Sequence, residues 1–459
     1  MGKQRAINMT VGNPTKLILQ LAVPLMLTNI GQQFYGIVDA AVVGRFVGIE
    51  AFASLGATDW SYWMILWSVQ AIAQGFGILV SQSFGSGNQK DLKKAIAMSV
   101  LLAGIFGAIL TAASVCGAAP LLRLLRTPQN IIGGAKAYLT TMYAGTLIVM
   151  AYNLSAAFLR AVGDGKTPLI AMLVAGACNI LLDLLFVAGF RMGIVGAAFA
   201  TLMSQVLAFA YCFRVILKMK IFRLSRADWQ PDGRVIKALL RLGIPLALSN
   251  IIVVAGGVIA QGVINTYDYI VIAGCTATNK LHGLLDCSGI GLGAATRTYI
   301  GQNWGANRMD RVRQGLRRSV VIGLVIAGSI MTVMILFGRR IVGLFLAADT
   351  ANSMEALDIA YRYLFVLSIF LLASYLMNVY RYALQGLGDS IAPMISGVFE
   401  FGARTATVFT LTAVIGVNGL FFMDGLAWTA AWLYQMVCYY LDLRKIKNKG
   451  LAYRHISSQ

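Results

Sequence analysis

Residues 17–46 read LILQLAVPLMLTNIGQQFYGIVDAAVVGRF, a run long enough to cross a bilayer as one helix, since about 20 apolar residues suffice. Asp39 lies toward the end of this run, among apolar neighbours. A carboxylate inside a membrane helix costs roughly 2.5–3.5 kcal/mol on insertion scales, so it either serves a function or reaches water at the interface. The stretch therefore predicts a membrane-spanning helix that carries a candidate ion-binding group.

The composition is that of a membrane protein. Hydrophobic residues make up 58% of the chain and charged residues 12%, with a mean hydropathy of +0.73, whereas soluble domains are about 25% charged. The net charge of +20 comes from short basic clusters between apolar runs, a pattern typical of cytoplasmic loops rather than of nucleic-acid binding. The six cysteines are scattered without a Cys-x-x-Cys pair, which predicts small buried side chains and no disulfide or zinc site.

The apolar runs predict an all-α integral membrane protein with twelve transmembrane helices. The expected spans are 17–42, 54–82, 95–119, 136–158, 168–189, 194–217, 239–264, 271–300, 318–345, 358–384, 391–415 and 419–441. Most Lys and Arg residues then fall in loops on one side of the bilayer, which predicts a multi-pass cell-membrane protein with both termini in the cytoplasm.

The two halves of the chain resemble each other. Pro24 in LAVPLMLTNI pairs with Pro245 in LGIPLALSNI, SQSFGSGN resembles GQNWGAN, and GDGKTP resembles GDSIAP, always in the same order. We therefore expect two pseudo-symmetric six-helix lobes at 1–217 and 239–459, joined by a cytoplasmic linker at 218–238, with a basic cytoplasmic tail. Repeats of this kind are typical of carriers that expose one site alternately to the two sides of the membrane.

A second group of polar residues lies in the expected fifth and sixth spans. Asn179 and Asp183 are four residues apart, hence on one face of a helix, and Thr201 lies in the small-residue stretch GIVGAAFAT. Together with Asp39 they offer two carboxylates, an amide oxygen and a hydroxyl, which suit a hard cation such as Na⁺. Crowded carboxylates could instead carry a proton, and an interhelical hydrogen-bond cluster without ion traffic is the structural alternative.

Five segments together resemble the multidrug and toxic compound extrusion (MATE) family over nearly the whole chain. They are NIGQQFYGIVDAAVVGRF, SQSFGSGN, LRAVGDGKTP, NILLDLLFVAGFRMGIVGAAFAT and IGQNWGAN. The resemblance implies the two-lobed MATE fold and an efflux antiporter that exchanges cationic or amphipathic organic compounds for Na⁺ or H⁺. It implies no catalytic residue and no cofactor beyond the coupling ion, and a monomer in the lipid bilayer is expected.

The resemblance is to the archaeal-type and DinF-like branch of that family, in which the N-terminal lobe carries the cation site. Carried over position by position, this site falls on Asp39, Asn179, Asp183 and Thr201. Substrate contacts in the same lobe would fall on Gln32, Tyr35, Asn153 and Met172.

The C-terminal lobe departs from this pattern. At the spacing that pairs Gly163 with Gly388, Asn179 pairs with Arg404, which cannot bind a cation. No second copy of the site is therefore expected, although Glu400 and Arg404 could form an intramembrane ion pair. A further polar cluster is expected near the start of the eighth span, formed by Lys280, His282 and Asp286. Ion coupling through a carboxylate of this lobe, Asp286 or Glu400, is an open alternative.

Two other functions deserve comparison. A lipid-linked oligosaccharide flippase of the same superfold would need a strongly basic cavity for a pyrophosphate group, but the candidate basic residues for such a cavity are few: Lys280, Arg297 and Arg404. A membrane enzyme is disfavoured, because neither His-Glu-x-x-His nor Gly-x-Ser-x-Gly occurs in the sequence.

Overall fold

The computed structural model describes residues 6–125, 127–344 and 351–448, except for the side chains of a few residues such as Tyr35. This described chain forms thirteen α-helices and no strand. The helices are α1 (Pro14–Phe46), α2 (Ile49–Gly85), α3 (Gln89–Leu124), α4 (Gln129–Ala144), α5 (Thr146–Ala161), α6 (Lys166–Asp183), α7 (Gly193–Lys218), α8 (Gly233–Ile264), α9 (Tyr269–Gly305), α10 (Met309–Gly343), α11 (Ala351–Leu387), α12 (Ile391–Ile415) and α13 (Met423–Asn448). Four short helical turns complete them: η1 (Leu184–Gly189), η2 (Lys220–Phe222), η3 (Arg226–Trp229) and η4 (Gly416–Phe422).

The expected all-α membrane fold is confirmed, and each of the twelve expected spans overlaps described helical structure. The span expected at 136–158 is divided at Gly145 into α4 and α5, which meet at 46°. The span expected at 168–189 continues from α6 into η1. Counting α4 and α5 together, the described helices make twelve crossings.

Length and apolar composition alone recover most of these crossings. Nine helical stretches of the described chain are long and apolar enough to span a membrane, or ten if the bent pair α4 and α5 is one span. In this test α12, η4 and α13 count as one stretch. Helix α9 is not among the nine, because its middle carries Asn279, Lys280, His282 and Asp286.

The internal repeat extends to the turns between helices. Gly163 and Gly388 both adopt left-handed backbone angles, with φ of 85° and 93°, which glycine tolerates without strain. The aspartate that follows each of them accepts backbone N–H bonds at the start of the next helix: Asp164 from Thr167 at 3.0 Å, and Asp389 from Ile391 at 2.9 Å. This shared Gly-Asp turn explains why α6 and α12 begin where they do.

The chain separates into two compact units. Of the described residues, unit 1 comprises those at 6–8 and 27–247, and unit 2 those at 9–26 and 248–448. Membership therefore changes inside α1 and inside α8, in each case just after a proline, Pro24 or Pro245. The lobe boundaries expected from the repeat, at residues 217 and 239, stay a prediction.

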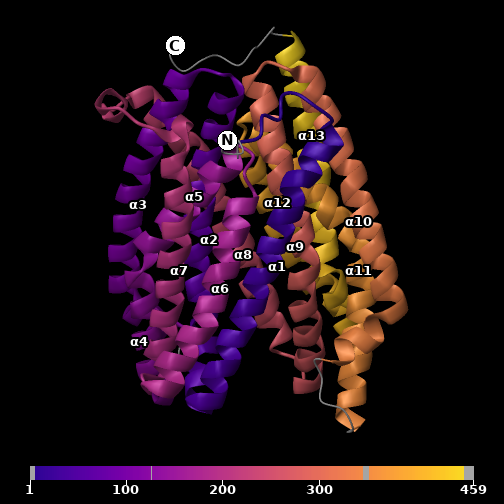
Figure 1. Cartoon of the computed structure of the whole chain (residues 1–459). Coiled ribbons are helices and arrows are strands. Elements are labelled where there is room, and N and C mark those ends of the chain that lie inside the picture. Colours follow the sequence, from indigo (N-terminus) through magenta and orange to yellow (C-terminus); the bar gives the residue numbers. More distant parts are fainter. Residues whose placement is uncertain (1–5, 126, 345–350, 449–459) are drawn as a thin grey trace. The chain divides into compact units, whose positions relative to one another are not determined.

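In unit 1, helices α2, α5 and α7 form the centre, and Figure 1 shows them side by side. Helix α3 packs on α2 and α5, α4 packs on α2 and α7, and α6 packs on α7. The core includes Phe76, Met98 and Leu159, all fully buried.

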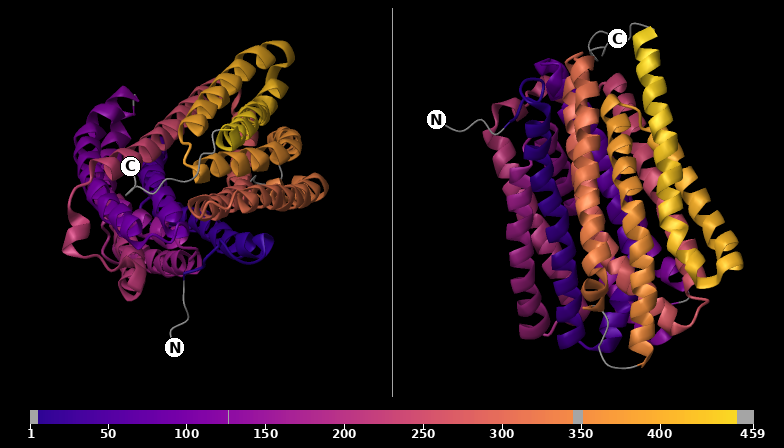
Figure 2. Two further views of the ribbon diagram at one scale, coloured as in Figure 1. Left: turned by 90° about the horizontal axis from the view of Figure 1, so that it is seen from above. Right: turned by 90° about the vertical axis from the view of Figure 1, so that its right-hand side faces the viewer.

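In unit 2, helix α11 is central and packs against α9, α10 and α13. Helices α12 and α13 lie against each other and are joined by η4, as the yellow end of the chain in Figure 2 shows. Tyr375 on α11 is fully buried, and its hydroxyl donates to the carbonyl of Leu285 on α9 at 2.9 Å.

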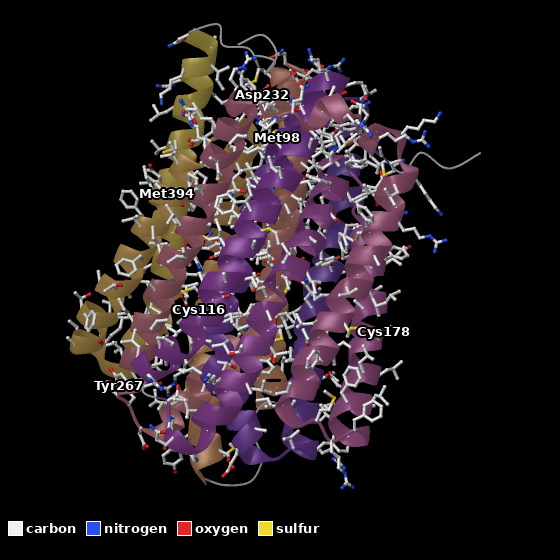
Figure 3. The ribbon with its side chains drawn as sticks, turned by 90° about the vertical axis from the view of Figure 1, so that its left-hand side faces the viewer. Met98, Cys116, Cys178, Asp232, Tyr267 and Met394 are labelled. Carbon is white, nitrogen blue, oxygen red and sulfur yellow. The ribbon has the colours of Figure 1, made fainter. Side chains whose placement is uncertain are left out.

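The cysteines behave largely as expected. All six have free thiols, and Cys212, Cys275 and Cys287 are buried. Cys116 on α3 and Cys178 on α6, both labelled in Figure 3, lie on different helices. Cys116 is exposed on the helix surface, so for this residue the expectation of a buried side chain is wrong.

The first half of α8 packs closely on α2 within unit 1. A Cβ atom on Gly75 would lie 2.6 Å from the Cα and 2.9 Å from the nitrogen of Gly243. Because the obstacle is backbone, we expect Gly75→Ala to destabilise the protein by about 1–3 kcal/mol. Gly104→Ala is the control, since nothing lies within 4 Å of its Cβ position. Thermal unfolding of both variants in detergent tests the contact, and equal midpoints would contradict it.

Candidate functional site

Two carboxyl groups meet inside unit 1. Asp39 on α1 is half-buried and Asp183, the last residue of α6, is 0% exposed. Their side chains lie within hydrogen-bonding reach of each other. Two carboxyl groups can share a hydrogen bond only if one of them is protonated, so the pair as two anions would repel.

Polar groups without partners surround this pair. Apart from the contact between the two carboxyl groups, both oxygens of Asp183, both amide atoms of Asn179 and the hydroxyl of Thr201 are buried with no hydrogen-bond donor or acceptor among the described residues. Asn179 is 1% and Thr201 6% exposed. Buried polar atoms left unpaired cost about 1–3 kcal/mol each, so such a concentration points to a guest that supplies the missing contacts.

These unpaired atoms are of the kind that a small cation or a proton would satisfy. The unpaired atoms are mostly oxygens, and two carboxylates, an amide oxygen and a hydroxyl suit Na⁺ better than a transition metal. No group of three or more His, Cys, Asp or Glu residues that could hold a metal occurs in the described part of the chain.

A change of helical winding places Asp183. The α-helix α6 ends at this residue and continues as the π-helical turn η1, a feature often found at functional sites. The turn is held against α7 at Gly196, where a Cβ would lie 3.2 Å from the Cβ of Phe186. The small residues of α7 thus permit the close helix approach expected from the sequence, with Ala197, Ala198 and Ala200 fully buried.

A small cavity, about 320 Å³ including its open mouth, adjoins Asn179 and Thr201. It lies between α1, α5, α6 and α7 of unit 1. Its lining is Gln32, Tyr152, Met172, Ala175, Gly176, Asn179, Thr201, Ser204, Gln205 and Ala208. Asp183 is one helical turn from Asn179, so the cavity and the carboxyl pair are adjacent parts of one polar region.

The expected substrate residues fall in different places. Gln32 and Met172 line the cavity. Asn153 does not line it, since its side-chain amide donates to the carbonyl of Val149 in its own helix at 2.8 Å. The side chain of Tyr35 lies outside the described residues.

Sequence reasoning missed several lining residues, of which Gln205 is the most informative. Its side-chain oxygen is buried without a hydrogen-bond partner among the described residues. Gln205 lies four residues after Thr201, hence on the same helix face, a spacing that could have revealed it. Tyr152 was missed because the family resemblance pointed to its neighbour Asn153.

In unit 2 the expected ion pair is present, whereas the expected cluster on α9 is not. Glu400 and Arg404 approach to 3.3 Å. Lys280 is exposed, the ring of His282 stacks on Trp428 at 5.1 Å, and Asp286 accepts a hydrogen bond from Ser374 at 2.9 Å. His282 and Asp286 are four residues apart and share one face of α9, but His282 contacts α13 and Asp286 contacts α11.

The comparisons with known proteins agree with this architecture. The family model MatE matches the chain twice, at residues 24–185 and 245–410. A probable multidrug resistance protein of Bacillus subtilis, YpnP, is 31% identical over 76% of this chain and 78% of its own length. A second one from that organism, YoeA, is 26% identical over 85% of each chain.

Solved structures match the fold. A structure described as the outward-facing conformation of a multidrug resistance MATE family transporter of the MOP superfamily superposes with a TM-score of 0.89. The match covers 98% of this chain and 100% of that one at 21% identity.

Proposed function

This chain belongs to the MatE family of membrane transporters, and we propose that it exports cationic or amphipathic organic compounds in exchange for Na⁺ or H⁺. The protein is a multi-pass transporter and not an enzyme. The observation that supports ion coupling is the buried pair Asp39 and Asp183, next to the unpaired polar atoms of Asn179 and Thr201.

The chemistry of exchange follows from the charge of this pair. With both carboxyl groups ionised and no guest, their repulsion in a low-dielectric site is strong. A Na⁺ ion bound by Asp39, Asn179, Asp183 and Thr201 would cancel the repulsion, and a proton shared by the two carboxyl groups would do the same. Either guest stabilises a contracted site, while its departure favours a wider one.

Helix α1 is suited to transmit this change. Asp39 lies on its second half, in unit 1, while its first half up to Met26 belongs to unit 2. Pro24 removes one backbone hydrogen bond just before that division, which permits bending there. We infer that contraction around the cation alters the bend of α1.

The proposed substrates enter through the same polar region. The relatives named above are probable multidrug resistance proteins, and the cavity combines the amide of Gln32 with the soft side chain of Met172, a mixture that suits varied amphipathic compounds. Contacts from Tyr35 and Asn153 remain expectations from the family resemblance. We further propose a monomer in the cell membrane with both termini in the cytoplasm.

The flippase alternative is not favoured. A pyrophosphate group needs basic side chains that are free to bind it, whereas Arg404 is paired with Glu400 and Asp424. Arg297 donates to Gln385 at 3.1 Å and lies over the ring of Tyr382.

A matched pair of variants on α1 tests whether the substrate binds in the cavity. Gln32 lines it, while the neighbouring Gln33 is exposed. We expect Gln32→Leu to raise the apparent KM for a cationic dye about tenfold, because a hydrogen bond to a charged partner contributes about 1.5 kcal/mol. Gln33→Leu should leave the KM unchanged. Equal KM values for the two variants, measured in dye-efflux assays, would exclude Gln32 from the substrate path.

The function itself is tested by dye retention. Cells that lack their own efflux pumps are loaded with ethidium, and its loss is followed with and without expression of this chain. We expect faster loss with the chain and a return to the background rate when a protonophore and a Na⁺ ionophore dissipate both gradients. Efflux that survives this treatment would exclude ion-coupled exchange.

A further inference from the structure

A chain of four alternating charges is buried in unit 2. Arg381 on α11 contacts Glu400 on α12 at 2.6 Å, Glu400 contacts Arg404 at 3.3 Å, and Arg404 contacts Asp424 on α13 at 2.9 Å. Their side chains are between 3% and 17% exposed. The two positive and two negative charges balance, so the group as a whole is neutral.

Arg404 is coordinated as a bound cation would be. Its Nε donates to Asp424, one terminal nitrogen to Glu400, and the other to the backbone carbonyl of Val253 at 3.3 Å. The second oxygen of Asp424 accepts from the hydroxyl of Tyr363 at 3.0 Å. Three helices thus supply two carboxylates and a carbonyl to one guanidinium group.

In the internal repeat, Arg404 occupies the position that corresponds to Asn179. Helices α6 and α12 begin at Lys166 and Ile391, after the same Gly-Asp turn, and at this spacing Asn179 corresponds to Arg404. Only this pair of positions corresponds, because at the same spacing Glu400 pairs with Ala175 and Asp183 with Val408. Each unit nevertheless has two carboxyl groups near this position: with unpaired polar atoms in unit 1, and with a fixed cation in unit 2.

We propose that Arg404 is the tethered resident cation of a carboxylate site in unit 2, formed by Glu400 and Asp424, which would bind a free monovalent cation if the guanidinium were removed. This unit is then held permanently in a cation-filled arrangement, and ion exchange is confined to unit 1. The comparison between the units rests on the proposed cation site of unit 1, but the presence of a latent site in unit 2 does not.

Charge balance gives the expected behaviour of an Arg404→Ala variant. Arg381 still neutralises Glu400, while Asp424 keeps the hydroxyl of Tyr363 and no ion pair within the described part of the chain. One uncompensated negative charge remains, in a space shaped for a planar guanidinium. A guanidinium ion from solution fits that space and restores neutrality, whereas the bulky choline ion does not fit.

The test measures thermal unfolding of the purified full-length protein in detergent, with guanidinium chloride from zero to tens of millimolar and choline chloride as the salt control. We expect the midpoint of Arg404→Ala to rise saturably by about 2–4 °C with guanidinium and not with choline. The wild-type protein should show no rise. The double variant Arg404→Ala/Asp424→Asn, which has no surplus charge, should not respond either.

If Arg404→Ala does not fold, the yield of monodisperse membrane-inserted protein replaces the midpoint. The double variant is then expected to restore that yield, because it removes the uncompensated charge. The proposal is overturned if Arg404→Ala folds and its thermal midpoint does not change with guanidinium. It is also overturned if Arg404→Ala does not fold and the double variant gives no higher yield. Neither measurement involves transport, so their failure is distinguishable from failure of the proposed antiport.

Discussion

Replacing Asp183 by asparagine is expected to reduce ion-driven efflux at least about a hundredfold, since a buried charged partner contributes about 3–5 kcal/mol. Asp183 is fully buried, and its carboxyl group faces that of Asp39. The amide keeps the shape of the side chain but removes the negative charge that attracts a cation. It also relieves repulsion with Asp39, so the amount of inserted protein should not fall. Dye efflux, normalised to transporter abundance in the membrane, measures the effect.

Asp232→Asn is the matched control. This aspartate, labelled in Figure 3, precedes α8 and accepts the backbone N–H of Arg234 at 3.0 Å. Asparagine caps helices as well as aspartate, so the control makes the same chemical change outside the proposed site. An Asp183→Asn transporter that retains the efflux rate of the control would remove Asp183 from the coupling mechanism.

Replacing Glu400 by glutamine is expected to destabilise the protein by about 3–5 kcal/mol, because it breaks a buried ion-pair network by removing one partner. Glu400 is 3% exposed and neutralises both Arg381 and Arg404. After the change Arg404 keeps Asp424, but Arg381 loses its carboxylate. We expect a lower thermal midpoint in detergent and a smaller yield of monodisperse protein.

Glu355→Gln on α11 serves as the control, since Glu355 is exposed. The free energy of unfolding of this variant should stay within about 0.5 kcal/mol of the wild-type value. Equal midpoints for the two variants would mean that the charges of unit 2 contribute little to its stability.

The helices were predictable because each membrane span is visible in the sequence itself. Each needs a long apolar run, and the expected span 391–415 coincides with α12 from first to last residue. The repeated Gly-Asp turns were visible as well, since Gly163 and Gly388 are glycines where the backbone requires left-handed angles. Some other helices, such as α2 and α3, extend several residues beyond the expected spans at both ends, because they continue into polar segments that hydropathy does not register.

The candidate site was predictable only in part. The proximity of Asp39 and Asp183 followed from the rarity of carboxylates in membrane helices, together with the family resemblance. The π-helical turn after Asp183 depends on packing against Gly196 and has no local signature in LLFVAG. The pairing of Arg404 with Asp424 joins residues on two helices, and only the three-dimensional arrangement reveals it.

The most direct test of the central claim uses purified protein in liposomes loaded with ethidium, under an imposed Na⁺ gradient or an imposed pH gradient. The wild-type protein should accelerate dye movement under at least one of them, in the direction opposite to the ion. The double variant Asp39→Asn/Asp183→Asn should respond to neither gradient while remaining correctly inserted. Gradient-driven dye movement by the double variant at the wild-type rate would contradict the account.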